Sequence, residues 1–324
     1  MQTILVSGAS GIVGYGALKS LRKADSNLKL IGTTIYTDSV APAFCDVFEL
    51  APATNDDIYL DWLCDIISKH KVDMLIPGID ADMQAWNEYR DEILSTGAVP
   101  LLNTHDLIQK CSDKWLFYET LKSVNLAYAI PTRLNGSYEE ITEEYGSPFL
   151  LKPRRGFASK GIVIVNSKEL FLQYQSNLGN VLMAQPIIGN EYEEYSISAF
   201  FDSESALCSW MSIKRTLAKE GYTEKAMVAI PEGAEEAIRA LADEFLPIGP
   251  TNFQFRVQEG QLKLLEINPR ISSATSIRAA FGYNESAMSV DYFLNKTTPV
   301  QPAIRSGFAV RYIEDKIFYD SNTV

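Results

Sequence analysis

Two strand-like segments, residues 252–257 and 262–268, carry oxygen-bearing side chains at a spacing that suits a metal ion. A short polar sequence ending in Gly260 separates them, as in a hairpin. Glu266 and Asn268 are two positions apart on one expected strand, so their side chains leave on the same face. Carboxylate and amide oxygens without His or Cys are hard ligands, which suit Mg²⁺ held together with phosphate groups. The alternative is a polar hairpin face in water.

The register of this hairpin decides whether Gln254 joins Glu266. A three-residue loop ending in a left-handed glycine pairs Asn252 with Glu266 and leaves Gln254 diagonal to Glu266 on one face. A two-residue loop would place Gln254 and Glu266 on opposite faces, because a one-residue slip inverts every side chain. We expect the three-residue loop, which groups Gln254, Glu266 and Asn268.

A second segment, residues 151–161, holds four cationic side chains and no acidic one. Lys152 ends an expected strand, and a loop with Gly156 and Gly161 follows before the return strand begins at Ile162. Such a loop can fold backbone N–H groups and a lysine over phosphate oxygens. The segment therefore predicts an anion site, with a solvated basic turn as the alternative.

Residues 7–14 form a glycine-bearing turn between an expected strand and an expected helix, the context in which a pyrophosphate meets a helix N-terminus. A dinucleotide site also needs an acid at the end of the second strand, but residues 30–35 end without one and the next acid is Asp38. Tyr-x-x-x-Lys pairs occur four times, so they identify no single oxidoreductase site. We expect the glycines to serve strand-to-helix packing, with a bound dinucleotide as the alternative.

Composition and charge exclude several classes of protein. Lys and Arg number 29 against 41 Asp and Glu, and the resulting charge of −12 opposes binding to a nucleic-acid backbone. No apolar run is long enough to span a bilayer, and no basic leader precedes the first strand, so we expect neither a membrane span nor secretion. The four cysteines contain no C-x-x-C pair, which predicts reduced thiols in a cytoplasmic protein.

Strand-like and helix-like segments alternate over residues 1–103, which predicts crossover units and a parallel sheet. From residue 149 onward strand-like segments follow one another in pairs, which predicts an α+β part with antiparallel sheets. The expected strand pairs are 149–152 with 162–165, 181–185 with 195–201, and 253–257 with 262–267.

With these motifs in this order, the chain resembles the ATP-grasp superfamily, in the branch related to the large chain of carbamoyl-phosphate synthetase. The resemblance covers nearly the whole sequence. Its motifs are the glycine-turn domain, the helix start Asp113-Lys114, the strand-loop Lys152 to Gly161, the linker Gln185 to Gly189 and the hairpin Gln254 to Arg270. The most specific run is Glu-Ile-Asn-Pro-Arg-Ile-Ser at residues 266–272.

The resemblance implies a fold class that combines α/β and α+β parts. A Rossmann-like parallel-sheet domain is expected over residues 1–103, followed by an ATP-grasp fold of two α+β subdomains over residues 104–305. Within the second part, a segment of about residues 131–185 is expected to form a lid. Residues 306–324 are expected to form a C-terminal extension.

The resemblance also implies ATP and Mg²⁺ as cofactors and gives roles to individual residues. Lys114 and Lys152 are expected to hold phosphates, the backbone around Ile187 to meet adenine, and Arg270 to stabilise the transferring phosphoryl group as a catalytic residue together with Lys152. The loop is expected to add nucleotide contacts from Ser159, Lys160 and Gly161. The expected metal ligands are Gln254, Glu266 and Asn268.

One position departs from the family pattern. Gln185 stands where the family usually has an acid for the ATP ribose. Its amide can still hydrogen-bond the hydroxyls, so we expect weaker or less selective nucleotide binding. The next acid of the nucleotide site is either Glu191 or Glu194, since both belong to a Glu-Tyr pair, and Glu194 is favoured because Tyr195 begins the next strand.

The function that the resemblance implies is a Mg²⁺-ATP-dependent carboxylate–amine ligase that forms an acyl phosphate and ADP. The chain holds one ATP-grasp copy, whereas the synthetase holds two, which favours a stand-alone ligase. Its partners are expected to be small-molecule carboxylate and amine substrates, without nucleic acid or membrane, and with a homodimer left open. The alternatives are an NAD(P)-dependent oxidoreductase using the glycine turn and a non-catalytic nucleotide-binding regulatory protein.

Overall fold

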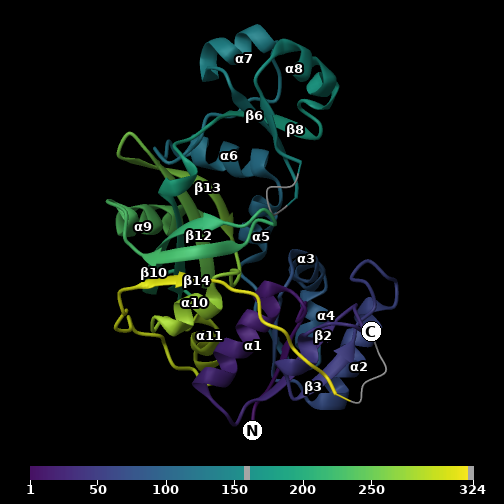
Figure 1. The fold of residues 1–324 in the computed structure, drawn as a ribbon. Helices are drawn as coiled ribbons and strands as arrows, with labels where there is room; N and C mark the ends of the chain where they lie inside the picture. The colour runs from purple at the N-terminus through teal and green to yellow at the C-terminus, as the bar shows by residue number, and fades with distance from the viewer. Residues whose placement is uncertain (157–160, 320–324) are drawn as a thin grey trace.

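The structure is a computed structural model that describes residues 1–156 and 161–319. These residues form a five-stranded, a six-stranded and a three-stranded sheet. Figure 1 shows the three-stranded sheet at the top, the six-stranded sheet below it and the five-stranded sheet at the lower right. The expected combination of a parallel-sheet part and a part with antiparallel sheets is confirmed. No helix in the described part of the chain has the length and apolarity needed to cross a membrane.

The five-stranded sheet is parallel throughout, in the order β3-β2-β1-β4-β5. Its strands are β1 (Thr3–Val6), β2 (Lys29–Thr34), β3 (Val47–Leu50), β4 (Met74–Ile76) and β5 (Val99–Pro100). Its helices are α1 (Ile12–Ala24), α2 (Tyr59–His70), α3 (Asp80–Glu88) and α4 (Arg90–Ser95). Alternate strand residues face opposite sides: Ile4 and Val6 pack with α1, and Leu5 packs against α2 and α3.

The six-stranded sheet has the order β13-β12-β9-β10-β11-β14 and is antiparallel. Its strands are β9 (Glu194–Phe201), β10 (Leu207–Leu217), β11 (Thr223–Val228), β12 (Gly249–Gln258), β13 (Gln261–Asn268) and β14 (Phe308–Val310). One face is apolar and packs on α5 (His105–Ser112), α6 (Lys114–Ser123) and α9 (Ala234–Phe245). The other face carries most of the charged side chains described below and meets α10 (Thr275–Ala280) and α11 (Glu285–Phe293).

The three-stranded sheet is a small unit with its own core. It consists of β6 (Phe149–Pro153), β7 (Val163–Val165) and β8 (Leu182–Pro186) in the order β7-β6-β8, with α7 (Tyr138–Tyr145) and α8 (Lys168–Tyr174). Its core joins Phe149 and Leu151 of β6 to Ile141, Phe171 and Ala184. Because this core is separate from the others, the unit is joined to the rest of the molecule through few elements.

The expected pairing of residues 181–185 with 195–201 is wrong. β8 pairs with β6, and β9 pairs with β10 and β12 in the larger sheet. β9 is buried at all eight positions, so it requires a neighbour on each side, and a short edge hairpin with β8 would not supply both. The linker between the two strands, residues 187–193, carries the chain from one sheet to the other.

The hairpin of β12 and β13 has a different turn from the one expected. Gln258 pairs with Gln261, so the loop has two residues, and both Glu259 and Gly260 have positive φ, at 52° and 76°. Positive φ at both central positions is the mark of a type I′ turn, which matches the twist of the strands. The expected three-residue loop is therefore wrong.

A β-bulge in the same hairpin places Gln254 and Glu266 on one face of the sheet, as expected. Phe255 pairs with Leu264, but the next pair is Gln254 with Glu266, so Leu265 is the extra residue of β13. The expected Asn252–Glu266 pair is wrong, because the two-residue turn and the bulge together move the register. Gln254 lies directly opposite Glu266 and shares its face.

The glycines of the N-terminal turn fit against the turn between β4 and α3. An ideal Cβ on Gly78 would lie 2.0 Å from the carbonyl oxygen of Ser7, and one on Gly14 would lie 2.3 Å from that of Gly8. The side chain of Ile79 covers Gly8, with its Cγ2 atom 2.6 Å from the ideal Cβ position. These contacts favour packing as the reason for the glycines, because the turn is covered by protein.

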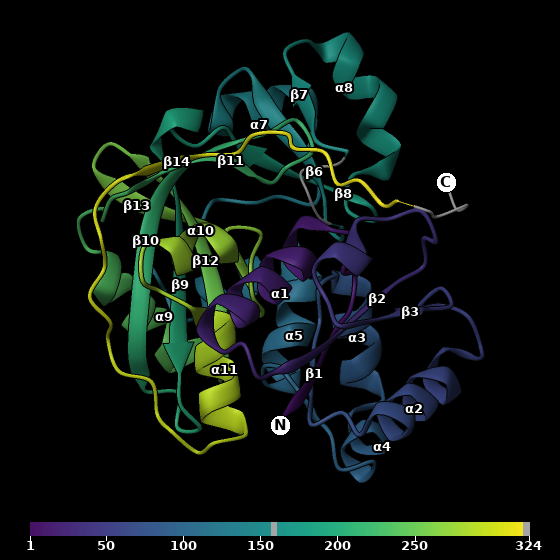
Figure 2. The same ribbon diagram turned by 60° about the horizontal axis from the view of Figure 1, so that its bottom comes forward.

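The C-terminal segment joins two of the sheets. β14 pairs with β11 at the edge of the six-stranded sheet, and Figure 1 shows the chain then passing in front of α1 towards the parallel sheet. Figure 2 shows the same segment above α1, on the side of the three-stranded sheet. Arg311 anchors this crossing, since its Nε donates to the carbonyl oxygen of Thr223 at 2.7 Å and its Nη2 donates to that of Ser273 at 2.5 Å.

Replacement of Gly78 by Ala tests the packing of the two turns. We expect Gly78→Ala to lower the free energy of unfolding by about 3 kcal/mol, because backbone must move to admit the methyl group. Gly11→Ala is the control: its Cβ would lie 3.3 Å from the nearest atom, and we expect a loss of about 1 kcal/mol or less. Equal stability of the two variants in urea unfolding would contradict the packing explanation.

Candidate active site

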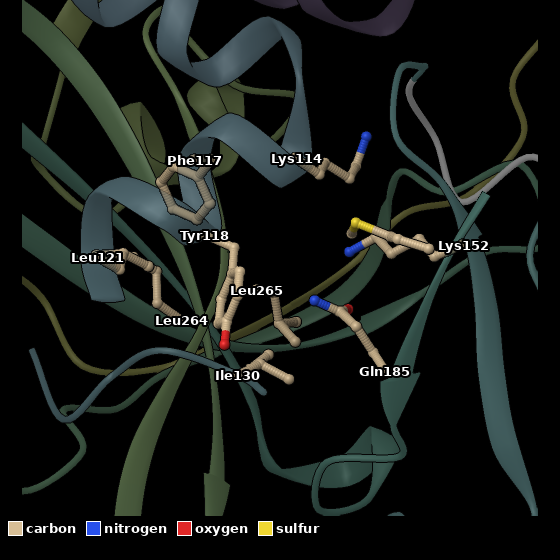
Figure 3. Close-up of a pocket in the computed structure, with 10 residues that line it drawn as sticks. Lys114, Phe117, Tyr118, Leu121, Ile130, Lys152, Gln185, Leu264 and Leu265 are labelled. Carbon is tan, nitrogen blue, oxygen red and sulfur yellow. The ribbon is translucent and has the colours of Figure 1, made fainter. Parts of the chain in front are cut away.

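A pocket opens between α6 and the three-stranded sheet (Figure 3). Lys152 enters it from β6 and Gln185 from β8, and Lys114 lies at the first turn of α6. The other lining residues are mainly apolar: Phe117, Tyr118, Leu121, Ile130, Met183, Leu264 and Leu265. A pocket with an apolar wall and a few cationic groups suits a ligand that has a flat apolar part and an anionic part.

The start of α6 is bonded to the basic segment. The backbone N–H of Lys114 donates to the carbonyl oxygen of Arg154 at 2.8 Å, and Nζ of Lys114 donates to that of Gly156 at 2.7 Å. The two expected phosphate lysines therefore reach the pocket from adjoining elements. Gly161 has a positive φ of 77° after the loop, and Ser159 and Lys160 lie outside the described residues.

Asp113 neutralises part of the basic segment. It is the N-cap of α6, with Oδ1 accepting from the backbone N–H of Trp115 at 2.9 Å. Its Oδ2 accepts from Nη2 of Arg154 at 2.8 Å and lies 3.5 Å from Nε of Arg155. Because Arg154 and Arg155 share this carboxylate, they hold the loop to α6, and Lys114 and Lys152 are the described cations that line the pocket.

Lys152 has a strongly perturbed pKa. Burial, opposed by the charge of Glu266 and reinforced by Lys114 and Arg256, lowers its pKa to about 8. The charged form is thus stabilised less than in water, and an anion in the pocket would restore that stabilisation. Perturbation by burial and neighbouring charges is typical of functional sites.

Gln185 is held by Thr132. Its Nε2 donates to the Oγ1 atom of Thr132 at 2.8 Å, which leaves Oε1 without a hydrogen-bond partner among the described residues. Ile187 follows in the linker and is about one-third exposed, at 36%. Glu191 lies in a 3₁₀ turn (Glu191–Glu193) on the exposed side of the same linker, whereas Glu194 begins β9 and is buried.

Glu194 lies between two arginines of the neighbouring strands. On β10, Arg215 donates from Nε at 3.1 Å and from Nη2 at 2.8 Å to Oε1 of Glu194. On β12, Arg256 donates from Nε to Oε2 at 3.0 Å. Two guanidinium groups share one carboxylate, so this part of the sheet keeps a net positive charge.

The metal-ligand candidates meet on the same face. Glu266 lies across the ladder from Gln254, and Nδ2 of Asn268 donates to Oε1 of Glu266 at 3.1 Å. Asn268 uses its Nδ2 group in this hydrogen bond. The Oδ1 atom of Asn268 and the carboxylate of Glu266 therefore remain as hard oxygen ligands for Mg²⁺. The Oε1 atom of Gln254, however, accepts from Nη2 of Arg215 at 2.6 Å.

This donor set fits one magnesium ion held together with phosphate oxygens. Within residues 1–156 and 161–319 no three His, Cys, Asp or Glu side chains cluster as a metal site, which agrees with a site that uses amide oxygens. Glu266 is its single carboxylate, so a bound ion needs further oxygens from a ligand.

Arg270 forms a bidentate ion pair with Asp80. Nε of Arg270 lies 2.6 Å from Oδ1 of Asp80, and Nη2 lies 3.0 Å from Oδ2. Asp80 is the first residue of α3, so this pair joins the parallel-sheet part to the loop after β13. Burial acts to raise the pKa of Asp80, but attraction to Arg270 and the hydrogen bonds with it outweigh burial and hold the pKa below its usual value.

A buried polar layer supports the sheet below these residues. Arg278 is fully buried and donates from Nη2 to the side chains of Ser196 and Asn252, both at 2.8 Å, and from Nη1 to Ser272 at 2.6 Å. Asn252 and Ser196 belong to β12 and β9, so Arg278 connects these strands to α10. Glu285 is the nearby carboxylate, 3.4 Å from Nη1.

The roles of four residues of this site were not predicted from the sequence: Asp80, Asp113, Arg215 and Arg256, of which Asp113 was named only as part of a helix start. Asp113 had a local signal, because an aspartate directly before a helix is a typical N-cap. The other three had none, since Asp80 is 190 positions from Arg270 and Arg215 is 21 positions from Glu194. Only the strand order and the domain arrangement bring them to the site.

Two family descriptions match the chain. Residues 180–316 match "ATP-grasp in the biosynthetic pathway with Ter operon". Residues 10–102 match "PylC-like, N-terminal domain". The two matches together include residues 10–14 of the glycine turn, the linker and the hairpin with Glu266.

Curated relatives include large chains of carbamoyl phosphate synthase. That of Methanosarcina mazei is 24% identical over 331 residues, which cover 90% of this chain and 29% of the relative. That of Thermotoga sp. (strain RQ2) is 24% identical over 334 residues, covering 94% of this chain and 30% of the relative. The chain thus spans less than a third of the length of these relatives.

Solved structures share the fold. N5-carboxyaminoimidazole synthetase from Staphylococcus aureus, complexed with ADP, superposes with a TM-score of 0.74 at 18% identity and covers 94% of this chain and 80% of its own. A biotin carboxylase complex with β-γ-ATP from Campylobacter jejuni gives a TM-score of 0.73 at 14% identity, over 95% of this chain and 74% of its own. At these identities the likeness shows the fold alone.

Replacement of Asp80 tests the ion pair between the two parts. We expect Asp80→Asn to lower the free energy of unfolding at pH 7 by about 2 kcal/mol. The substitution removes the carboxylate and leaves the guanidinium of Arg270, which is largely buried, without its charged partner. The pKa of Asp80 is depressed, so its contribution is present above the unfolded-state pKa of about 3.9 and is lost as pH falls through the folded-state pKa.

Urea unfolding at pH 7 and at low pH measures this difference. The difference in free energy of unfolding between wild type and Asp80→Asn should disappear at low pH, where Asp80 is protonated. Asp46→Asn is the control, because its pair with Arg22 is exposed on both sides, at 47% and 35%, and should contribute less than about 1 kcal/mol. A gap for Asp80→Asn that stays constant with pH would contradict the assigned ion pair.

Proposed function

Because the chain is an ATP-grasp superfamily protein with a PylC-like N-terminal domain, we propose that it is a Mg²⁺-ATP-dependent ligase that joins a carboxylate to an amine or a related nucleophile. The observation that carries the proposal is the meeting of two separate sets of groups at one place. Lys152 faces the pocket from the three-stranded sheet, and Glu266 acts on its pKa from the hairpin of the six-stranded sheet. Cations for phosphates and oxygens for a metal thus lie within electrostatic reach of each other.

The nucleotide is proposed to occupy the pocket of Figure 3. Its phosphates would lie at Lys114, Lys152 and the loop that ends at Gly161, with Ser159 and Lys160 as further proposed contacts. Its adenine would meet the backbone near Ile187. The remaining candidates for the ribose are Gln185, whose Oε1 is free, and Glu194.

Glu194 is proposed to act mainly through its arginines. Both of its carboxylate oxygens accept hydrogen bonds from Arg215 and Arg256, so its capacity to accept from ribose hydroxyls is reduced. Together with Gln185 in place of an acid, this arrangement supports weaker recognition of the ribose and stronger recognition of the phosphates.

The proposed chemistry has two steps. A carboxylate oxygen of the substrate attacks the γ-phosphorus, the bond from that phosphorus to the β,γ-bridging oxygen breaks, and ADP and an acyl phosphate result. The amine then attacks the acyl carbon, loses a proton and displaces inorganic phosphate. Mg²⁺ on Glu266, Asn268 and, in the simplest assignment, Gln254 would neutralise charge on the phosphates when bound.

The protein groups are proposed to align the reactants and compensate their charge. Lys152 would face the transferring phosphoryl group from one side. Arg270 would stabilise it from the other, with its guanidinium oriented by Asp80 at 2.6 and 3.0 Å. Since Asp80 begins α3 at the carboxyl ends of the parallel strands, the substrate carboxylate is proposed to bind between that edge and Arg270.

The three-stranded unit within residues 131–185 is proposed to be a lid. Its core is its own, and in Figure 1 it stands at one end of the molecule above α6. The bonds from Lys114 and Asp113 to residues 154–156 tie its phosphate loop to the base of the site. Closure of such a unit over bound nucleotide would exclude water from the acyl phosphate.

Nucleotide binding should depend on Lys152 and on its protonation. We expect Lys152→Ala to weaken ATP binding by about 1.5–3 kcal/mol, roughly tenfold to a hundredfold, because a charge-assisted contact is lost. Since the pKa of Lys152 is about 8 in the free protein, wild-type affinity should fall as pH rises from 7 towards 9.5. Lys152→Arg should remove that pH dependence.

Calorimetric titration with ATP across this pH range makes the measurement. Lys168→Ala is the matched control, because Lys168 also lies in the three-stranded unit but is exposed and paired with Glu139 at 2.6 Å. Unchanged affinity in Lys152→Ala would overturn the assignment of the phosphate site.

The acyl phosphate can be trapped without knowledge of the amine. In the presence of hydroxylamine, the correct carboxylate should yield a hydroxamate and an equal amount of ADP. We expect Glu266→Gln to lower this rate at least about a hundredfold while the protein stays folded, because the site loses its single carboxylate ligand.

A panel of amino acids, sugar acids and small dicarboxylates can be screened one acid at a time. Lys263→Gln, a change of another charged residue of β13, is the control and should keep the wild-type rate. Equal hydroxamate formation in Glu266→Gln and wild type would show that the metal hairpin is misassigned. Tight ATP binding with no ADP from any acid would support a non-catalytic protein instead.

A further inference from the structure

We infer that the guanidinium of Arg215 takes the place of a metal ion at Gln254, so that the nucleotide complex of this protein holds one metal ion, on Glu266 and Asn268, and none on Gln254. The inference rests on the proposed nucleotide and magnesium site and changes one part of it. Gln254 becomes the partner of a fixed guanidinium and ceases to be a metal ligand.

The position of Arg215 is set by the strand order. Lys214 pairs with Tyr195 in the ladder of β10 and β9, so Arg215 is next to Glu194, and Gln254 is on the other side of β9 opposite Ser196. The side chain of Arg215 therefore reaches over β9 to the metal hairpin. Its Nη2 donates to Oε1 of Gln254 at 2.6 Å.

Arg215 is fixed in this position. Its side chain is 4% exposed, as is that of Glu194, which accepts from both Nε and Nη2 of Arg215. Nη1 lies 3.5 Å from Oγ1 of Thr223. A buried guanidinium that is held through two of its nitrogens by one carboxylate oxygen has little freedom to leave when a ligand arrives.

The charge of this pair is not balanced. Arg256 takes the other oxygen of Glu194, so one carboxylate serves two guanidinium groups. The surplus positive charge is on the sheet face beside Gln254, with Lys152 close enough for Arg256 to lower its pKa. Glu266, directly opposite Gln254, offsets part of this positive charge, and the polyphosphate of the proposed nucleotide would offset the rest.

A metal ion on Gln254 would meet this guanidinium directly. Mg²⁺ binds oxygen ligands at about 2.0–2.1 Å, and Nη2 of Arg215 already lies 2.6 Å from the only oxygen of the Gln254 side chain. Both cations would share one amide oxygen in a buried place, where repulsion between like charges is strong. Glu266 and Asn268 lie on the far strand of the hairpin and keep oxygens without an arginine.

Counting bound metal ions tests the inference independently of turnover. Mn²⁺ is the probe, and electron paramagnetic resonance counts the ions bound per chain at saturating non-hydrolysable ATP analogue. Wild type should bind one. Arg215→Met should bind two, because the Oε1 atom of Gln254 then accepts from no guanidinium and lies across the ladder from Glu266.

Arg256→Met is the matched control. It also removes one guanidinium from Glu194, but Arg256 does not contact Gln254 in the described structure, so its count should stay at one. Gln254→Ala in the wild-type background gives a second test that keeps Arg215 buried with Glu194. The count should stay at one, with Mn²⁺ affinity changed less than threefold.

The outcomes separate this inference from the proposed function. Two ions in wild type, one ion in Arg215→Met, or a tenfold loss of Mn²⁺ affinity in Gln254→Ala would each overturn the role given to Arg215 and leave the ligase proposal standing. Absence of any nucleotide-dependent Mn²⁺ binding in wild type would overturn both. One ion in wild type and two in Arg215→Met alone, with Arg256→Met unchanged, is the expected result.

Discussion

The candidate site depends on one β-bulge. The type I′ turn at Glu259 and Gly260 would by itself put Gln254 and Glu266 on opposite faces of the sheet. The extra residue Leu265 shifts the ladder by one position, which turns Glu266 to the charged face and leaves the apolar face continuous behind it. Leu265 itself lines the pocket of the candidate site. A hairpin without the bulge would bury the carboxylate in the apolar core.

Charge compensation across the chain organises the rest of the site. Each carboxylate that orients a guanidinium belongs to a different element from that arginine. Asp113, the N-cap of α6, binds Arg154, and Asp80 of α3 binds Arg270. Glu194 of β9 binds the arginines of β10 and β12. These pairs fix the direction of guanidinium groups that would otherwise repel each other in a partly buried cleft. Lys152 has no such carboxylate partner within residues 1–156 and 161–319, and burial lowers its pKa, so an anionic ligand would stabilise its charged form.

Much of the fold followed from local pattern. The short apolar runs separated by helix-like stretches predicted the parallel sheet, and β6 with β7 paired as expected. β3 has a weaker local signal, because Val47–Leu50 is only partly buried at the sheet edge and carries no clear alternation. The partner of β8 was wrong because two adjacent strands in sequence can belong to different sheets, and pairing depends on which core each strand fills.

The sequence alone determined the residue types of the site: the Glu-x-Asn-Pro-Arg run, the lysine that ends a strand before a glycine loop, and the glycine turn lacking a ribose acid. Those signals are local, since side chains two apart on a strand share a face and a lysine's place in a strand-loop motif needs no distant contact. Tertiary structure decided the register that sets Gln254 opposite Glu266, the acid that orients Arg270, and the presence of Arg215 on the amide oxygen of Gln254. These depend on a bulge, on the packing of one domain against another and on strand order, and no spacing within a single segment encodes them.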